Sequence, residues 1–243
     1  MSTKKFGLIL TTLLFLNTLA HGNPSNKKWG ISLLNVNQRE KGKITHGNFL
    51  KLPFHDGKIN VDAKIKLLKL DYFPYPFLGF YGIGGTIDAK ATIENIKMKL
   101  GPFSVPIKKH ITKKSEGYLY GGGILLGGAY KNIFLLGQYT YTEIHLKGDV
   151  ASKKAEVYTS RLGYTYRVNE KITINPYGAI TYQESNANIT GTIKNYNFNF
   201  NVELEEIIPS AGILFTLPYD FTLVGEYSFG KRQFLALELG YRF

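Results

Sequence analysis

The stretch FTLVGEYSFGKRQFLALELGYRF, residues 221–243, decides the fold class. It contains two alternating runs, 221–229 and 234–243, with a polar tetrapeptide between them. In each run large apolar or aromatic side chains recur at every second position, and the positions between them are mostly small, polar or charged. A period of two is that of a β-strand, and about ten residues suit a tilted strand that crosses a membrane. The sequence therefore predicts a terminal β-hairpin with one apolar face.

The same alternation recurs upstream, with turn residues between the runs. Counting back from the C-terminus predicts ten strands, near residues 29–36, 59–73, 77–93, 117–130, 133–147, 154–168, 171–185, 205–217, 220–229 and 234–243. Short turns alternate with longer polar connections, which in outer-membrane barrels are the periplasmic turns and the outer loops. The predicted fold is all-β, a transmembrane antiparallel up-and-down β-barrel of about ten strands, with eight or twelve strands as alternatives.

Three features depart from this pattern. Pro176 and Pro209 fall inside predicted strands, where a missing N–H interrupts the hydrogen bonding between strands, so we expect bulges or shifted strand ends there. Around Leu67 and Leu68 the apolar residues change parity, and a β-bulge would explain the change.

Residues 1–22 have the composition of a secretory signal peptide. Two lysines precede an apolar run from Leu8 to Leu16, and small residues follow where a signal peptidase needs them. The alternative is an anchoring helix, but the run is shorter than the ~20 apolar residues that a spanning helix requires. We expect cleavage before Asn23, so that 23–243 is the barrel domain.

The composition narrows the setting of the protein. The chain has no cysteine, which excludes disulfides and thiolate metal sites and is typical of export through an oxidising periplasm. The formal net charge is +12, and it falls to +10 without the two lysines of the signal peptide. A basic chain can bind nucleic acid, but an exported protein meets lipopolysaccharide and acidic surface polymers instead. We therefore expect no nucleic-acid partner, with a basic surface that only water contacts as the alternative.

The last strand resembles that of bacterial outer-membrane β-barrel proteins. It ends in Leu239, Tyr241 and Phe243, similar to the C-terminal aromatic signal that the barrel-assembly machinery reads in that family. The stretch DYFPYPFLGFYG at 71–82 resembles a hairpin of small, largely uncharacterised barrels. The resemblance implies insertion into the outer membrane of the Gram-negative cell envelope, with the barrel-assembly machinery as a partner during insertion, and it implies no activity.

The sequence predicts no catalytic residue, no metal site and no cofactor. Glu143 and His145 lie two residues apart at a predicted strand end and share a face, but no serine stands beside them in a recognisable nucleophile motif. No His-x-x-x-His or similar ligand spacing occurs. An outer-membrane enzyme that modifies lipid or peptide is therefore the least favoured interpretation.

One group of charged residues is expected to line the lumen, because it occupies the strand faces opposite the apolar ones. The group comprises Lys69, Asp71, Asp88, Lys90, Arg161, Arg167, Glu226, Glu238 and Arg242. Its mixed signs predict pairing across a plugged or narrow lumen, since ten strands enclose little more room than side chains fill. An open lumen is the alternative.

A second group lies in the predicted outer loop 94–116. It comprises Lys97, Lys99, Lys108, Lys109, Lys113 and Lys114. We expect this loop to bind a polyanion such as lipopolysaccharide, and a solvated loop without a partner is the alternative. The sequence thus predicts an outer-membrane barrel with a structural or surface-interaction role, in contact with membrane lipid and lipopolysaccharide. A narrow, porin-like passive channel for ions or small solutes is the alternative function.

Overall fold

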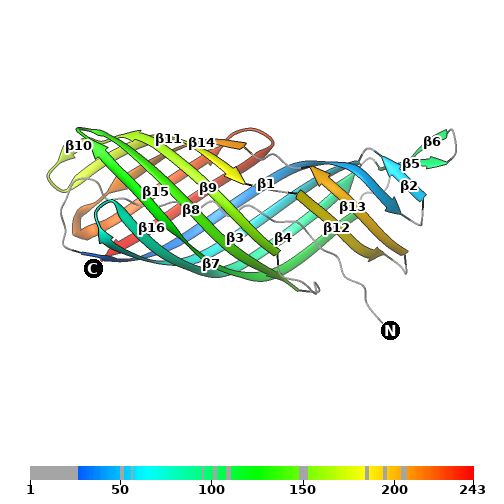
Figure 1. Cartoon of the computed structure of the whole chain (residues 1–243), viewed down its shortest axis with the longest axis horizontal. Coiled ribbons are helices and arrows are strands. Elements are labelled where there is room, and N and C mark those ends of the chain that lie inside the picture. Colours follow the sequence, from blue (N-terminus) through cyan, green and yellow to red (C-terminus); the bar gives the residue numbers. More distant parts are fainter. Residues whose placement is uncertain are drawn as a thin grey trace.

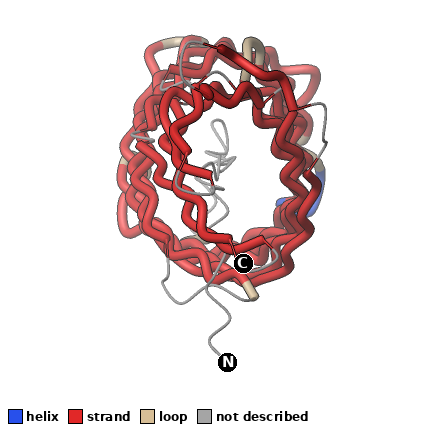
Figure 2. The backbone as a smooth tube through the Cα atoms, turned by 90° about the vertical axis from the view of Figure 1, so that its right-hand side faces the viewer, coloured by secondary structure: helices blue, strands red, loops and turns tan. Residues whose placement is uncertain are grey.

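The computed structural model describes residues 27–49, 52–55, 57–94, 96–100, 103–107, 111–147, 153–183, 186–193, 196–203 and 207–243. These residues form β-strands and one short 3-10 turn, η1 (Pro218–Asp220). None of them forms a helix long and apolar enough to cross a bilayer. Ten of the strands close into an antiparallel barrel, whose ring of strands is seen end on in Figure 2.

The barrel strands follow one another around the ring in chain order. They are β1 (Trp29–Phe49), β3 (Gly57–Tyr75), β4 (Leu78–Glu94), β7 (Ile111–Tyr130), β8 (Ile133–Leu146), β9 (Lys153–Tyr164), β11 (Ile172–Gln183), β14 (Ile207–Thr216), β15 (Phe221–Ser228) and β16 (Arg232–Arg242). The ring closes where β16 pairs with β1, from Arg242 opposite Gly30 to Arg232 opposite Glu40. A closed ring leaves no free strand edge, and the predicted ten-stranded antiparallel barrel is confirmed.

The remaining strands extend the barrel. They are β2 (Leu52–His55), β5 (Ile96–Leu100), β6 (Phe103–Ile107), β10 (Tyr166–Asn169), β12 (Asn186–Ile193) and β13 (Tyr196–Glu203). All except β10 lie at the end of the barrel opposite the C-terminus (Figure 1). There β13 pairs with β1 beyond the point where β16 ends. The wall of β1, β3, β4 and β7 has strands of 17 to 21 residues, against 8 to 11 in β14, β15 and β16, so one wall extends farther than the other.

The two faces of β3 exchange their chemistry partway along the strand. The short turns, at 76–77, 131–132, 170–171 and 218–220, lie at one end of the barrel. On the side of β3 toward this end, Leu68 is exposed outside and Lys69 is buried inside. On the side away from it, Lys66 is exposed and Leu67 is buried. The pairing of β3 with β1 and with β4 passes through this level without a register shift. The predicted bulge is therefore wrong. A barrel wall in hydrocarbon has apolar residues outside and polar residues toward the lumen. A wall in water has polar residues outside and apolar residues inside. The exchange therefore marks the level where β3 leaves the apolar environment.

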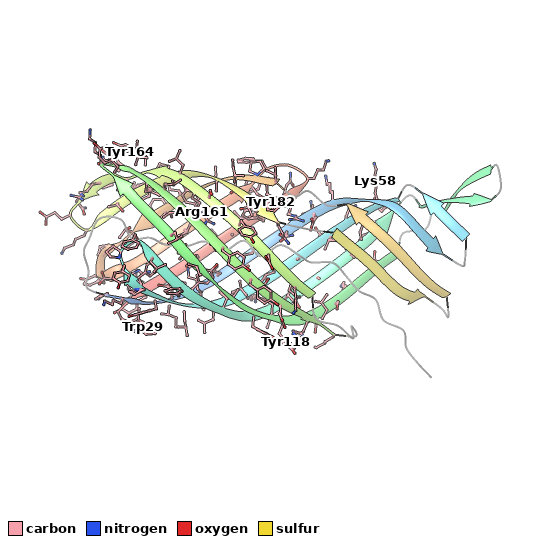
Figure 3. The ribbon with its side chains drawn as sticks, viewed as in Figure 1. Trp29, Lys58, Tyr118, Arg161, Tyr164 and Tyr182 are labelled. Atoms are coloured by element: carbon pink, nitrogen blue, oxygen red, sulfur yellow. The ribbon has the colours of Figure 1, made fainter. Side chains whose placement is uncertain are left out.

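Beyond this level most of the buried side chains are apolar, although Glu40 and Arg232 are also buried there. The apolar side chains are at most 4% exposed and include Val36, Ile59, Val61, Ile65, Ile87, Ala91, Val157, Ile208, Phe234 and Ala236. The outward residues of β1, β3 and β4 at this level include the charged Arg39, Lys64 and Lys90, and Lys58 lies on the outside at this end in Figure 3. This part of the wall is therefore built like a water-soluble sheet.

Exposed aromatic rings mark two levels along the outside. Figure 3 shows Trp29 and Tyr164 near the short turns, and Tyr118 and Tyr182 about halfway along the molecule. The outward residues between the two levels are apolar, among them Leu33, Leu70, Leu135, Leu162, Ile180 and Leu237. An apolar belt with aromatic residues at both edges is the exterior that a bilayer requires of a spanning barrel.

Both prolines lie where the neighbouring strand is interrupted. Pro176 of β11 lies opposite the break between β9 and β10, where Thr165 leaves the sheet and donates its N–H to Asn132 at 2.7 Å. Pro209 of β14 lies opposite the end of β15, and its carbonyl accepts a hydrogen bond from Phe229 N at 2.9 Å. The shifted strand ends that the sequence predicted are present at both positions.

Gly123 gives a first testable prediction. A Cβ there would lie 2.1 Å from the Tyr139 carbonyl oxygen and 2.3 Å from the Tyr81 hydroxyl. We expect Gly123→Ala to destabilise the barrel by about 1–3 kcal/mol, because a close-packed interior must shift to admit the methyl group. Urea unfolding followed by heat-modifiable gel mobility measures the change. Gly84→Ala is the matched control, since its Cβ meets nothing within 4 Å, and equal midpoints for the two variants would contradict the prediction.

Candidate functional site

The lumen is the candidate functional site, because buried charges gather there. Six of the nine predicted lumen residues lie inside, each at most 8% exposed: Lys69, Asp71, Arg161, Glu226, Glu238 and Arg242. Charges taken out of water are costly unless they are paired and hydrogen-bonded. Their partners therefore show what the lumen can do.

The central network is organised around Glu226 of β15. Its carboxylate accepts hydrogen bonds from Arg161 Nε at 3.2 Å, from the Tyr177 hydroxyl at 2.8 Å and from Ser210 Oγ at 2.7 Å. The Arg161 guanidinium carbon also lies 5.9 Å from the centre of the Tyr177 ring. Three strands, β9, β11 and β14, thus contribute donors to one carboxylate of β15.

The network continues across the lumen through Gln138. Arg161 Nη1 donates to Gln138 Oε1 at 2.8 Å, and Gln138 Nε2 donates to the Tyr81 hydroxyl at 2.8 Å. That hydroxyl shares a 2.5 Å hydrogen bond with Thr140 Oγ1. The chain of contacts therefore runs from β15 to β4, on the other side of the ring, and Arg161 is labelled near its middle in Figure 3.

A second network lies nearer the short turns. Arg242 Nη2 donates to Asp71 Oδ1 at 2.7 Å, and its guanidinium stacks over the Phe73 ring at 4.4 Å. Lys69 pairs with Glu238. Both pairs join β16 to β3 across β1, and Gly30 of β1 leaves the space, because a Cβ there would lie 2.6 Å from Asp71 Oδ1.

A third network, at the far end, was missed from the sequence. Arg232 Nε donates to Glu40 Oε1 at 2.7 Å and Nη1 donates to Gln183 Oε1 at 3.1 Å. Gln38 Nε2 lies 3.5 Å from the second Glu40 oxygen. The predicted strands 29–36 and 234–243 leave out both Glu40 and Arg232. The alternation of the two strands could have identified both residues. In β1 and in β16 the even-numbered residues point inward, and Glu40 and Arg232 continue these two series.

Three predicted lumen residues lie elsewhere. Asp88 and Lys90 are exposed on the outer face of β4, beyond the level at which the faces exchange their chemistry, where outward residues are charged and inward residues apolar. Arg167 is exposed in β10, whose four residues are all exposed. The prediction for these three residues is wrong. For Asp88 and Lys90 it assumed a polar lumen along the full length of the strand, and for Arg167 it assumed that the strand there still had a buried face.

Glu143 and His145 lie together on the outer wall. Glu143 accepts hydrogen bonds from the hydroxyls of Tyr120 at 2.8 Å and Tyr141 at 3.0 Å. His145 stacks on Tyr118 with ring centres 4.8 Å apart, and its Nε2 is 3.8 Å from Glu143. Hydrogen bonds from two tyrosine hydroxyls therefore hold Glu143, and a tyrosine ring stacks on His145. Among the described residues no group of histidine, aspartate and glutamate could hold a metal ion.

The predicted polyanion-binding segment is not one loop. It contains β5, β6 and the first residues of β7, and Lys114 is exposed on β7. The side chains of Lys97, Lys99, Lys108, Lys109 and Lys113 lie outside the described residues. The expected signal peptide, 1–22, also lies outside them.

The predicted assembly residues, Leu239, Tyr241 and Phe243, are exposed on the outer face of β16 and its end. Tyr241 packs against Phe221, with ring centres 5.1 Å apart. Beside this end Lys27 donates a hydrogen bond to Asp220 at 2.5 Å, which raises the pKa of the Lys27 amine above its usual value. The two ends of the described barrel also meet, since Phe243 N donates to Trp29 O at 3.0 Å.

No protein-family model and no curated protein matches this chain. Among solved structures it is similar to the outer membrane protein OprG from Pseudomonas aeruginosa, with 11% sequence identity, coverage of 93% of this chain and 99% of that chain, and a TM-score of 0.47. It is also similar to the translocator domain of the autotransporter NalP from Neisseria meningitidis, at 12% identity, 93% and 91% coverage and a TM-score of 0.44. For the toluene transporter TodX from Pseudomonas putida the identity is 9%, both coverages are 91% and the TM-score is 0.36. The fold assignment rests on the strand pairings of this chain itself.

Proposed function

We propose that this chain is a bacterial outer-membrane barrel that acts through its surface, as a structural or interaction protein without catalysis, and does not conduct solutes. The filling of the lumen by three networks of paired charges carries the proposal. The central cation of each network is almost fully buried, with Lys69 and Arg232 at 0% exposure and Arg161 at 2%. Side chains that are buried and paired in this way occupy the space through which a solute would pass.

The placement in the outer membrane is part of the proposal. It is supported by the apolar belt with its aromatic edges, which a bilayer would cover. Export through the expected signal peptide, 1–22, leads to the periplasm. Insertion by the barrel-assembly machinery would use the exposed residues Leu239, Tyr241 and Phe243 of the terminal strand.

Conductance tests the proposal directly. We expect the purified protein to show no steady single-channel steps in a planar bilayer, because paired side chains fill the lumen. The double variant Arg161→Ser, Glu226→Ser shortens both members of the central pair and is expected to show small steps. Recordings on preparations with equal amounts of heat-modifiable barrel make the comparison. Stable ohmic conductance of the unaltered protein would establish the alternative function, a narrow passive channel.

The proposal also includes contact between the basic outer segment and lipopolysaccharide. We expect the quadruple variant Lys97→Gln, Lys99→Gln, Lys108→Gln, Lys109→Gln to weaken salt-sensitive binding to lipopolysaccharide. Each exposed pair contributes only ~0–1 kcal/mol and is screened by salt, so several lysines must act together. Binding isotherms at low and high salt provide the measurement. Unchanged binding at low salt would show that the segment is a solvated face.

A further inference from the structure

A groove of about 710 Å³ crosses the outer face of the barrel wall. Residues of β1, β3, β4 and β7 line it on one side, and residues of β15 and β16 line it on the other. It is open to the outside, since the charged side chains along it, such as Lys64, Lys90 and Lys114, are exposed. Of the lysines along it, only Lys114 belongs to the basic segment 94–116 for which a partner is proposed above.

The groove lies at the level where the apolar belt ends. Along β3 the outward residues change from Leu68 to Lys66 and then to Lys64. Along β16 they change from Leu235 to Gln233, and both of these residues line the groove. Lipid headgroups occupy the level that directly follows the hydrocarbon of a bilayer. A molecule in this groove would therefore have its polar part beside the lysines and its apolar part beside the belt.

The charges of the groove are unequally engaged. Arg39 pairs with Asp62 at 2.8 Å, and Glu116 pairs with Lys147 at 3.0 Å. Of the lining cations, Lys64, Lys90 and Lys114 form no ion pair with any described residue. The same holds for Lys66, which does not line the groove but lies one outward position nearer the apolar belt on β3. Among the carboxylates that line the groove, Asp88 is the one that forms no ion pair with a described residue. Four available ammonium groups against one carboxylate favour an anion.

Three stacked rings, those of Tyr118, His145 and Tyr120, lie on the wall near these lysines. Tyr118 is in register with Lys66 through Thr86 of β4. The His145 ring stacks between Tyr118 and Tyr120, with ring centres 4.8 and 5.6 Å apart. Rings with an apolar body and a polar tip contact acyl chains and headgroups together. The wall thus offers ammonium groups, aromatic rings and the apolar belt in one continuous surface.

We propose that this wall binds the phosphorylated headgroup of an anionic glycolipid of the outer leaflet, of the lipopolysaccharide type. The inference rests on the proposed placement in the outer membrane and deepens its lipid contact. Ammonium groups bind phosphate as point charges, and lysines on neighbouring strands reach phosphates at different positions of one headgroup. The apolar belt below the lysines takes the acyl chains, which a soluble polyanion lacks.

The test removes three of the lysines that are not part of the segment 94–116. The triple variant Lys64→Gln, Lys66→Gln, Lys90→Gln is compared with Lys28→Gln, Lys131→Gln, Lys171→Gln, which removes the same charge from the end with the short turns. Full-length barrels in nanodiscs are given bis-phosphorylated lipid A, and native mass spectrometry counts the retained lipid. We expect the triple variant to lose about tenfold in retention at low salt, and the control to retain as much lipid as the parent.

Two further probes separate the sources of the anion. Dephosphorylated lipid A should be retained as poorly by the parent as lipid A is by the triple variant, and soluble inorganic polyphosphate should not displace bound lipid A at equal phosphate concentration. Unchanged retention by the triple variant, or equal retention of the dephosphorylated lipid, would overturn the site. Displacement by polyphosphate would overturn the lipid as its occupant. The conductance of the unaltered protein is a separate measurement, so the proposed function can fail while this site stands.

Discussion

Glu226→Ala is expected to destabilise the barrel by about 3–5 kcal/mol, the cost of leaving a buried charge without its partner. Arg161 is 2% exposed and would lose its carboxylate. Tyr177 and Ser210 would lose their acceptor in the same step. The loss would affect four strands together, because the carboxylate joins β9, β11, β14 and β15.

Urea unfolding of the folded barrel in lipid vesicles measures this effect. The double variant Arg161→Met, Glu226→Leu should recover most of the lost stability, because apolar side chains of similar volume often replace a buried ion pair without loss. Asp62→Ala is the matched control, since it breaks the exposed pair with Arg39 and should cost less than about 1 kcal/mol. A Glu226→Ala barrel as stable as the Asp62→Ala barrel would contradict the prediction.

Changing both Tyr241 and Phe243 to Asp is expected to abolish membrane-embedded, heat-modifiable protein. The two rings are 37% and 54% exposed on the apolar exterior, and they belong to the strand that closes the ring against β1. Carboxylates on that surface would face lipid and would remove the aromatic end that resembles an assembly signal. Fractionation of the envelope with unheated and heated gel samples provides the measurement.

The control for this variant places two carboxylates above the apolar belt. Asn37→Asp and Gln233→Asp add them to exposed positions of β1 and β16 that line the outer groove. This control should insert as the parent does, because those positions lie outside the hydrocarbon, at a level where charged groups keep contact with water. Normal yields of embedded barrel from the Tyr241→Asp, Phe243→Asp variant would exclude a role of these rings in assembly.

Most of the strand pattern could be predicted because lipid and lumen impose opposite chemistry on alternate residues. In β16 that alternation holds to Phe243, and the strand was predicted within two residues. The first strand was predicted to reach residue 36, with an extension past it left open, and it runs to Phe49. Its continuation has polar residues on both faces, such as Asn37 outside and Gln38 inside, so no apolar alternation remains to detect.

The errors at the site have one physical origin. A single polarity was assumed for each face, and this placed Asp88 and Lys90 in the lumen, although the structure puts them outside. The pair of Arg232 and Glu40 was missed because its members lie 192 residues apart and meet only when the ring closes. Local patterns carry no information on contacts at such separations, whereas strand register around the closed ring fixes them.

The exchange of chemistry between Leu67 and Leu68 also sets how deeply the molecule sits. A strand rises about 3.3 Å per residue, so a shift of two residues toward the end with the short turns would immerse the ammonium group of Lys66 in hydrocarbon. A shift of two residues the other way would lift Leu68 into water. Both displacements are opposed, by charge desolvation in one direction and by apolar hydration in the other. The wall therefore fixes the depth of the barrel in the bilayer and is matched to one bilayer thickness. A thinner or thicker membrane would have to deform around the barrel.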